Sequence, residues 1–322
     1  DMVDAARERL LEAVAEADDE LANKYLEGEE ISQAELISGL RQGIAAGLIV
    51  PVMIGATTSQ IGTSDVLDAI VDFLPSPEDV GPVVAMSEDG ETSLPPKNDG
   101  PLAALVFKTA ADLFVGKLSY FRVYSGNLAS DSQLINANTS GAERIGQVFV
   151  INGKEQETVT DLATGDIGAT PKLNSVLTGH TLCTKENQMT LGGPEFSLPL
   201  YQMAIFPKSQ ADVDKMTSSL ARIVEEDPSL SVTREPNTLE VLLGGLGHTH
   251  VEIAVEKMKR KFGSEMVLEL PKMAYKETVA GTAKVEYRHK KQSGGHGQYG
   301  HVKLEIEPLE RGAGFEFAQT VV

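Results

Sequence analysis

A single glycine-rich stretch separates two strand-like segments of the chain: Lys291-Gln292-Ser293-Gly294-Gly295-His296-Gly297-Gln298-Tyr299-Gly300-His301-Val302. Before it, Ala283, Val285 and Tyr287 alternate with polar residues, and after it Val302, Leu304 and Ile306 do the same. A period of two predicts an antiparallel strand pair with one apolar face. The residues from Gln292 to Gly300 exceed what a hairpin turn needs, so the sequence predicts a long loop there.

The composition of this stretch is compatible with two roles. Its glycines allow a phosphate or another backbone to approach closely, and Tyr299 is suited to stack on a base or sugar. Basic and histidine side chains flank it, namely Lys284, Arg288, Lys290, Lys291, Lys303, His289, His296 and His301. The alternative is a hairpin tip whose charges are merely solvated. The residues alone leave the choice between these roles open.

Residues 194–271 have the order β-α-β-β-α-β of a split, ferredoxin-like fold. Strands are expected at 201–206, 230–234, 239–243 and 266–270. The first helix begins at Ser209 and Asp212, with an apolar face of Val213, Met216, Leu220, Ile223 and Val224. The second begins at a capping box of Thr249 and Glu252, with an apolar face of Val251, Val255, Met258 and Phe262. We therefore expect a four-stranded antiparallel sheet with both helices on one face.

The part of the chain before residue 194 changes character twice. Residues 103–183 contain short apolar segments separated by glycine-containing turns, which predicts an antiparallel β-barrel. Residues 75–101 are rich in Pro, Gly, Ser and acidic side chains and are interpreted as a linker.

The first 75 residues are typical of the closing part of an α/β domain. An amphipathic helix is expected at 4–26, a second one after the capping box of Ser32 and Glu35, and a third around 65–73. The apolar run 48–54 has the composition of a buried parallel strand.

Charge and cysteine content narrow the class of protein. Of 322 residues only Cys183 is a cysteine, which excludes a disulfide framework and a cysteine zinc site within this chain. No secretory signal or long apolar segment occurs, so a cytoplasmic location without a membrane partner is expected. The net charge is -19, but acidic residues crowd the first hundred positions and basic ones gather after residue 255. This asymmetry makes the C-terminal part the candidate RNA-facing end.

The stretch quoted first resembles the domain IV loop of elongation factor G, a translational GTPase, which has Arg at the position of His296. Further similarity lies, in the family's order, at 25–30, 67–77, 101–108, 115–118, 122–126, 165–169, 179–183 and 221–228. The resemblance implies a multidomain α/β and β fold with four parts. These are the C-terminal remainder of a GTPase domain (1–76), a linker with β-barrel domain II (77–193), ferredoxin-like domain III (194–271) and the N-terminal part of domain IV (272–322).

The same resemblance implies function and partners. The intact protein would be a ribosome-associated GTPase that uses GTP and magnesium to promote tRNA-mRNA translocation. Its partners would be ribosomal RNA, tRNA and mRNA, and it would act as a monomer. The implied RNA contacts are Lys291, Gln292, Ser293, Gly294, Gly295, His296, Gly297 and Tyr299, and the implied guanine-contacting residues are Gly55, Ala56 and Thr57. Most of the GTPase domain and the remainder of domain IV are expected to lie outside this chain.

Two motifs depart from the family pattern. Gly55-Ala56-Thr57 stands where the family has Gly-Ser-Ala, and Gly247-His248-Thr249-His250-Val251-Glu252 stands for Gly-Glu-Leu-His-Leu-Glu. Such changes suggest a divergent paralogue. His248 and His250 are two residues apart at a helix start, so their rings point apart and a shared metal ion is not expected. The alternatives to a translocase are a non-catalytic ribosome- or RNA-binding module and a recycling- or protection-type relative.

We predict that residues 1–322 neither bind GTP with useful affinity nor hydrolyse it. The sequence contains no Gly-x4-Gly-Lys-[Ser/Thr] phosphate loop and no Asn-Lys-x-Asp motif, so the amides, lysine and hydroxyl that hold the phosphates and magnesium are absent. Isothermal titration with GTP and magnesium measures this directly. Micromolar binding would contradict the prediction.

Overall fold

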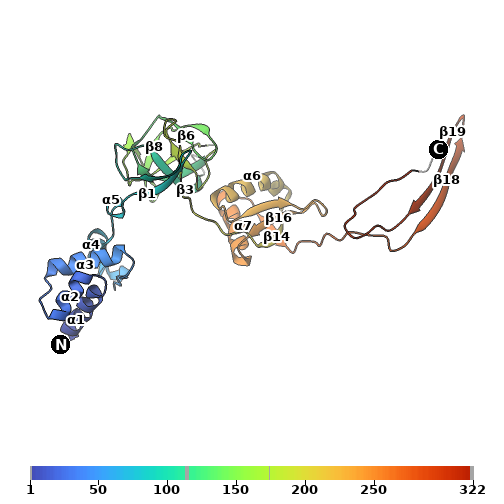
Figure 1. The fold of residues 1–322 in the computed structure, drawn as a ribbon. Coiled ribbons are helices and arrows are strands. Elements are labelled where there is room, and N and C mark those ends of the chain that lie inside the picture. The colour runs from blue at the N-terminus through green and yellow to red at the C-terminus, as the bar shows by residue number, and fades with distance from the viewer. Residues whose placement is uncertain (1, 113–115, 174, 320–322) are drawn as a thin grey trace.

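The computed structural model describes residues 2–112, 116–173 and 175–319. Figure 1 shows four units following one another, from the N-terminal helices in blue to a two-stranded ribbon in red. The multidomain α/β and β architecture expected from the sequence is confirmed. In the described part of the chain, no helix is long and apolar enough to cross a bilayer.

The N-terminal unit is helical. It contains α1 (Met2–Ala15), α2 (Asp19–Glu27), α3 (Gln33–Ala45), the short 3-10 helix η1 (Thr57–Ser59) and α4 (Thr63–Phe73). The single helix expected at 4–26 is wrong, because Asp18 accepts from the amides of Glu20 and Leu21 at 2.9 and 3.0 Å and starts a new helix. The capping box of Ser32 and Glu35 is confirmed.

The apolar run 48–54 does not form the predicted buried strand. It has no regular structure, and Ile54 is 93% exposed. A parallel strand exists only when neighbouring strands accept and donate its backbone hydrogen bonds. No strand of the described residues lies beside this run, so its composition alone cannot make it a strand.

The linker expected at 75–101 is also largely wrong. It contains α5 (Pro77–Val80), β1 (Val83–Ser87) and β2 (Gly90–Leu94). With β13 (Met189–Leu191), β1 and β2 form a three-stranded antiparallel sheet. Buried residues of this sheet pack against Ala103 and Leu105, so the stretch belongs to the barrel unit.

The barrel unit is built on one antiparallel sheet of eight strands in the order β7-β6-β12-β3-β4-β11-β8-β9. They are β3 (Ala103–Asp112), β4 (Gly116–Ser125), β6 (Gln133–Asn136), β7 (Gly141–Arg144), β8 (Val148–Asn152), β9 (Glu155–Val159), β11 (Ile167–Pro171) and β12 (Thr181–Cys183). A separate pair joins β5 (Leu128–Ala129) and β10 (Asp161–Leu162). The sheet surrounds a core that includes Phe121, Val123, Ile145 and Leu182.

The third unit confirms the predicted ferredoxin-like order. It contains β14 (Tyr201–Pro207), α6 (Gln210–Glu226), β15 (Ser231–Arg234), β16 (Val241–Gly245), α7 (His248–Phe262) and β17 (Met266–Glu269). All pairs of the sheet β15-β16-β14-β17 are antiparallel. One buried cluster joins Ile223 of α6 and Met258 of α7 to Leu243 of the sheet, so both helices cover one face.

Details at both helix starts differ from the sequence prediction. The Ser209 hydroxyl donates to Asp212 at 2.6 Å instead of accepting a helix amide. The capping box of Thr249 and Glu252 is absent. Gly247 is the N-cap residue of α7 and has no side chain that could accept from a helix amide. Val213 was expected in the core but is 43% exposed.

The last unit is a hairpin of β18 (Ala283–Ser293) and β19 (His296–Ile306). The predicted apolar face is confirmed, because Val285 lies opposite Leu304 and Tyr287 opposite Val302. The long loop is wrong: the ladder continues to the pair of Ser293 and His296, and only Gly294 and Gly295 make the turn. Gly294 has a φ of 69°, the positive value that two-residue hairpin turns need.

We predict that Ile223→Ala destabilises the ferredoxin-like unit by about 2–5 kcal/mol, because Ile223 is 1% exposed and its loss leaves a cavity. Val213→Ala on the same helix is the control and is expected to cost less than about 1 kcal/mol. Urea titration followed by hydrogen exchange of peptides from residues 201–269 measures both. Equal losses of stability in the two variants would contradict the difference in burial between Ile223 and Val213.

Candidate nucleic-acid interface

The hairpin has two chemically different faces. Directly paired residues of an antiparallel ladder share a face, and successive pairs alternate between faces. One face carries the apolar pairs described above and continues to the tip with His289 and Lys291. The other face carries Lys284, Glu286, Arg288 and Lys290, opposite Glu305, Lys303, His301 and Tyr299 respectively.

At the base of the charged face, opposite charges neutralise one another. Lys284 Nζ lies 2.6 Å from Glu305 Oε1. Glu286 contacts two partners, His301 Nε2 at 2.6 Å and Lys303 Nζ at 3.2 Å. The hydrogen bond from His301, followed by that from Lys303, holds the pKa of Glu286 below its ordinary value. Lys284 and Lys303, two of the five Lys and Arg residues that flank the glycine-rich stretch, are therefore paired within the hairpin.

The tip half keeps its positive charge. No ion pair within the described residues involves Arg288, Lys290 or Lys291. Residues 287–303 contain four Lys or Arg and no Asp or Glu, in a chain of net charge -19. A local excess of cations at the end of a protruding ribbon is suited to phosphate.

The glycines at the tip fall into two kinds. Gly294 needs its positive φ, as described for the turn. Gly295 and Gly300 do not have a positive φ, and a Cβ atom added at either would meet nothing within 4 Å in the described chain. Gly297 would make only ordinary contacts, the nearest at 3.8 Å. Neither a positive φ nor packing among the described residues explains why these three positions lack side chains.

Tyr299 supplies an aromatic surface beside these glycines. It is 67% exposed and lies opposite Lys290 on the charged face. Across the ladder, Gln292 pairs with Gly297 and His289 pairs with Gly300. His289 Nε2 and Gln298 Oε1 are 3.3 Å apart. An exposed aromatic ring next to glycine backbone and cationic side chains can stack on a base, while the cations bind the neighbouring phosphate.

The backbone thus places the predicted RNA contacts together at one end of the molecule. Lys291, Gln292, Gly297 and Tyr299 lie in the paired strands, Gly294 and Gly295 form the turn, and Ser293 and His296 are its flanking pair. The structure has no long loop, but the residues predicted to contact RNA still lie next to one another. The missed signal was Gly294-Gly295, because a two-residue glycine turn between alternating segments predicts a tight hairpin.

The second predicted site, Gly55-Ala56-Thr57, lies in the N-terminal unit and is exposed. Ala56 and Ile61 exchange backbone hydrogen bonds of 3.0 and 3.1 Å and close a small loop. A Cβ at Gly55 would stand 3.0 Å from the Ile61 carbonyl oxygen, a tight contact that a side chain could make only if the loop shifted by a few tenths of an ångström. Among the described residues the Thr57 amide has no hydrogen-bond partner, which leaves it able to donate to a ligand.

His248 and His250 have separate partners. His248 Nδ1 lies 3.1 Å from the Tyr201 hydroxyl, and its Nε2 lies 3.1 Å from Glu252. His250 accepts from the Leu246 amide at 3.1 Å through Nδ1 and has Nε2 3.0 Å from Asp227. The sequence did not indicate Tyr201 or Asp227 as partners. Within the described residues no group of three or more His, Cys, Asp or Glu side chains could hold a metal ion.

Comparison with known proteins gives consistent matches along the chain. Models of elongation factor G domain 2, domain III and domain IV match residues 101–185, 196–270 and 271–322. The chain belongs to the elongation factor G family. A crystal structure of a protein from Thermus thermophilus is similar, with 32% sequence identity and a TM-score of 0.70 over 94% of this chain.

The chain covers 44% of the length of that Thermus protein. The eight-stranded barrel lies within the residues that match elongation factor G domain 2. The ferredoxin-like unit lies within the residues that match domain III. The hairpin with its cationic tip lies in the domain IV match.

We predict that His301→Ala raises the pKa of Glu286 toward its ordinary value of 4.5. Because the folded pKa is lowered, the contact stabilises the hairpin above about pH 4.5 and is lost as pH falls through the lowered value. Carboxyl-carbon NMR during a pH titration measures the shift. Lys284→Ala is the control, since Lys284 pairs with Glu305. An unchanged pKa in the His301 variant would refute the assigned contact.

Proposed function

We propose that the intact protein drives movement of tRNA and mRNA on the ribosome in a cycle that uses GTP and magnesium. Membership of a family of translation factors supports the class of function. The boundaries at residues 76, 193 and 271 are part of this proposal, as are the cytoplasmic location and the monomeric state. The departures at Gly55-Ala56-Thr57 and at His248 support a divergent member of the family.

The observation that carries the proposal is the set of tip glycines that the chain itself does not need. A glycine inside a strand weakens it, and an alanine at Gly295 or Gly300 would fit the space available. Close approach of a partner to the backbone explains the missing side chains. Arg288, Lys290 and Lys291 beside them make phosphate the favoured partner chemistry.

In this proposal the chain performs two tasks. The Gly55-Ala56-Thr57 loop presents the Thr57 amide to a guanine base that the rest of a GTPase domain would hold. The hairpin tip meets tRNA and mRNA in the decoding region, where bare backbone and Tyr299 approach the nucleotides. A change of nucleotide state would move the tip through altered packing between units.

A non-catalytic ribosome-binding module is a second candidate. Ala56 favours it, because the family's serine at this position supports the base contact and alanine has no hydroxyl. Ribosome-stimulated GTP hydrolysis by the intact protein separates the two candidates. Binding to ribosomes without any hydrolysis would support the module and contradict the translocase.

We predict that Gly295→Ala combined with Gly300→Ala slows tRNA movement on pre-translocation ribosomes by roughly tenfold while leaving the hairpin folded. Alanine is conformationally allowed at both sites and is expected to stabilise the fold by about 0.4–1 kcal/mol. The function should fall because two methyl groups occupy the space that the partner's backbone or base needs.

The matched control is Gly146→Ala, which also has open space and no positive φ but lies in the barrel unit. It should leave tRNA movement unchanged. Melting temperature and GTP hydrolysis of each full-length variant confirm folding and nucleotide use. Full activity of the double tip variant would refute the contact and leave a solvated hairpin end.

A further inference from the structure

The contact between the barrel and the ferredoxin-like unit lies where strand β3 loses its outer neighbour. β3 pairs with β12 only over Ala103–Leu105, whereas its pairing with β4 continues to Asp112. The segment before β12 then covers the outer edge for a short distance. Val106 exchanges backbone hydrogen bonds with Gly179 and His180, and Thr178 donates to the Thr109 hydroxyl at 3.1 Å.

Beyond Thr109, the edge is completed by the next unit. The Ala111 amide donates to Glu226 Oε1 at 2.5 Å, and the Ala111 carbonyl accepts from Lys261 Nζ at 3.4 Å. Glu226 comes from the end of α6 and Lys261 from the last turn of α7, and the two side chains pair with each other. A carboxylate and an ammonium group thus replace the carbonyl and amide of a missing neighbour strand.

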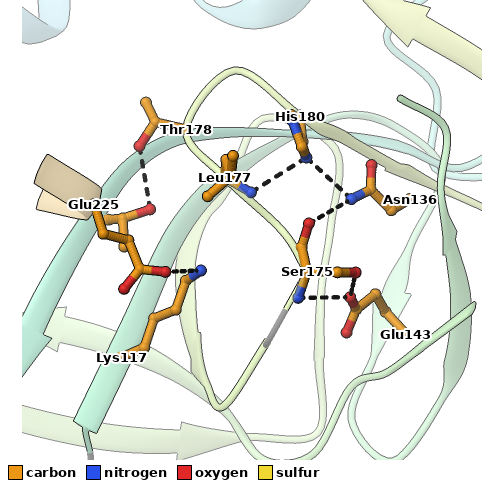
Figure 2. A network of polar contacts seen from close by, with 9 residues as sticks. Lys117, Asn136, Glu143, Ser175, Leu177, Thr178, His180 and Glu225 are labelled. Carbon is orange, nitrogen blue, oxygen red and sulfur yellow. Dashed lines mark hydrogen bonds and ion pairs between the residues drawn. The ribbon is translucent and has the colours of Figure 1, made fainter. Parts of the chain in front are cut away.

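A second ion pair lies beside the first. Glu225 of α6 contacts Lys117 of β4, as Figure 2 shows next to the loop that carries Thr178. The side chains of Lys117 and Glu226 are only 14% and 11% exposed, and those of Glu225 and Lys261 about a third. These pairs are therefore shielded from solvent more than ordinary surface pairs.

The barrel side of this contact is held in place by its own polar network. Asn136 donates to the Ser175 carbonyl at 3.1 Å and to His180 Nδ1 at 3.0 Å. The Leu177 amide also donates to His180 Nδ1, at 3.2 Å. Burial, and then the charge of Lys117, lower the pKa of His180, which favours the neutral ring that these donors require. These bonds hold the loop that carries Thr178 in place beside β3.

Glu225 and Glu226 lie at the carboxyl end of α6, where acidic side chains are unfavourable. The carboxyl end of a helix carries partial negative charge, so an acidic residue there is unfavourable by about 0.3–1 kcal/mol. The last turn of α6 contains Glu225 and Glu226 and no basic residue. Lys117 of the barrel pairs with Glu225 across the contact, and Lys261 of α7 pairs with Glu226 within the ferredoxin-like unit, so the two pairs together offset what the helix alone would lose.

Among the described residues, the interactions found between the two units are hydrogen bonds and ion pairs, whereas the unit cores are apolar. The buried clusters of the barrel unit contain no residue of the ferredoxin-like unit, and the cluster of the latter contains none of the former. Separating the units would break the pair of Lys117 and Glu225 and free the Ala111 amide and carbonyl, whereas the pair of Glu226 and Lys261 lies within the ferredoxin-like unit and would remain. Such an exchange has a small net free energy, because solvation of the freed ions compensates much of the lost attraction.

We propose that Lys117, Glu225, Glu226 and Lys261 form a reversible interdomain latch. Closed, the latch fixes the orientation of the ferredoxin-like unit on the open edge of β3. Open, it frees the two units to change their relative orientation with both cores intact. This device is a property of the described chain and does not depend on the proposed activity.

The test uses the chain of residues 1–322 with fluorophores at Lys154→Cys in the barrel and Glu256→Cys on α7, since Cys183 is buried. Lys117→Ala with Glu226→Ala should broaden a narrow distance distribution between the dyes. The same variant should speed hydrogen exchange in a peptide covering Ala103–Asp112 about tenfold, because the Ala111 amide loses its charged acceptor.

Two further variants make the outcome specific. Lys208→Ala breaks the pair of Lys208 and Glu265 within the ferredoxin-like unit and should change neither readout. Lys117→Glu with Glu225→Lys reverses one pair and should restore a narrow distribution that Lys117→Glu alone destroys. Unchanged distance and exchange in the alanine variant would overturn the proposal.

Loss of folding is distinguished by far-ultraviolet circular dichroism. If the alanine variant unfolds, Glu225→Gln with Glu226→Gln keeps the side-chain shapes and removes the charges. A broadened distribution in that folded variant supports the latch. A distribution as narrow as that of the parent overturns it, as does a broad distribution in the parent itself.

Discussion

Each unit of this chain must bury its own apolar residues, because the clusters of the barrel and the ferredoxin-like unit share no members. Among the described residues, the interactions found between these two units are hydrogen bonds and ion pairs. The Ala111 amide donates to Glu226 and the Ala111 carbonyl accepts from Lys261, so a partner at this edge must supply both an acceptor and a donor. In the proposed latch, the hydrogen-bonding groups of a strand edge and the ion pairs beside them set the orientation of the units.

Local periodicity was enough to predict elements whose stabilising partners are close in sequence. The ferredoxin-like order followed from helical spacing around Leu220 and Met258 and from strand-like segments between the helices. The alternation in β18 and β19 gave the correct apolar face. The family resemblance agrees with the matches over residues 101–322, since long motifs such as the tip are specific.

Sequence reasoning failed where structure depends on remote partners. The run 48–54 has the composition of a buried strand, but a strand also needs neighbours, which the described residues do not provide. The stretch 75–101 was interpreted from its Pro and Gly content, whereas β1 pairs with β13, which lies far along the chain. The contacts of the latch could not be predicted from the sequence either, because nothing near Glu226 indicates Ala111 as its partner.

At the hairpin tip, the proposed contact rests on an observation that the sequence alone did not provide. The sequence predicts a long loop there, and the ladder running to Ser293 replaces it with a two-residue turn. Gly300 lies in a regular strand and Gly295 in the turn, neither has a positive φ, and the space around both is open in the described chain. A side chain absent from a position that would accept one indicates a requirement imposed from outside the chain. In the proposed function, the backbone of a nucleic acid meets this requirement beside Arg288, Lys290 and Lys291, which have no acidic partner among the described residues.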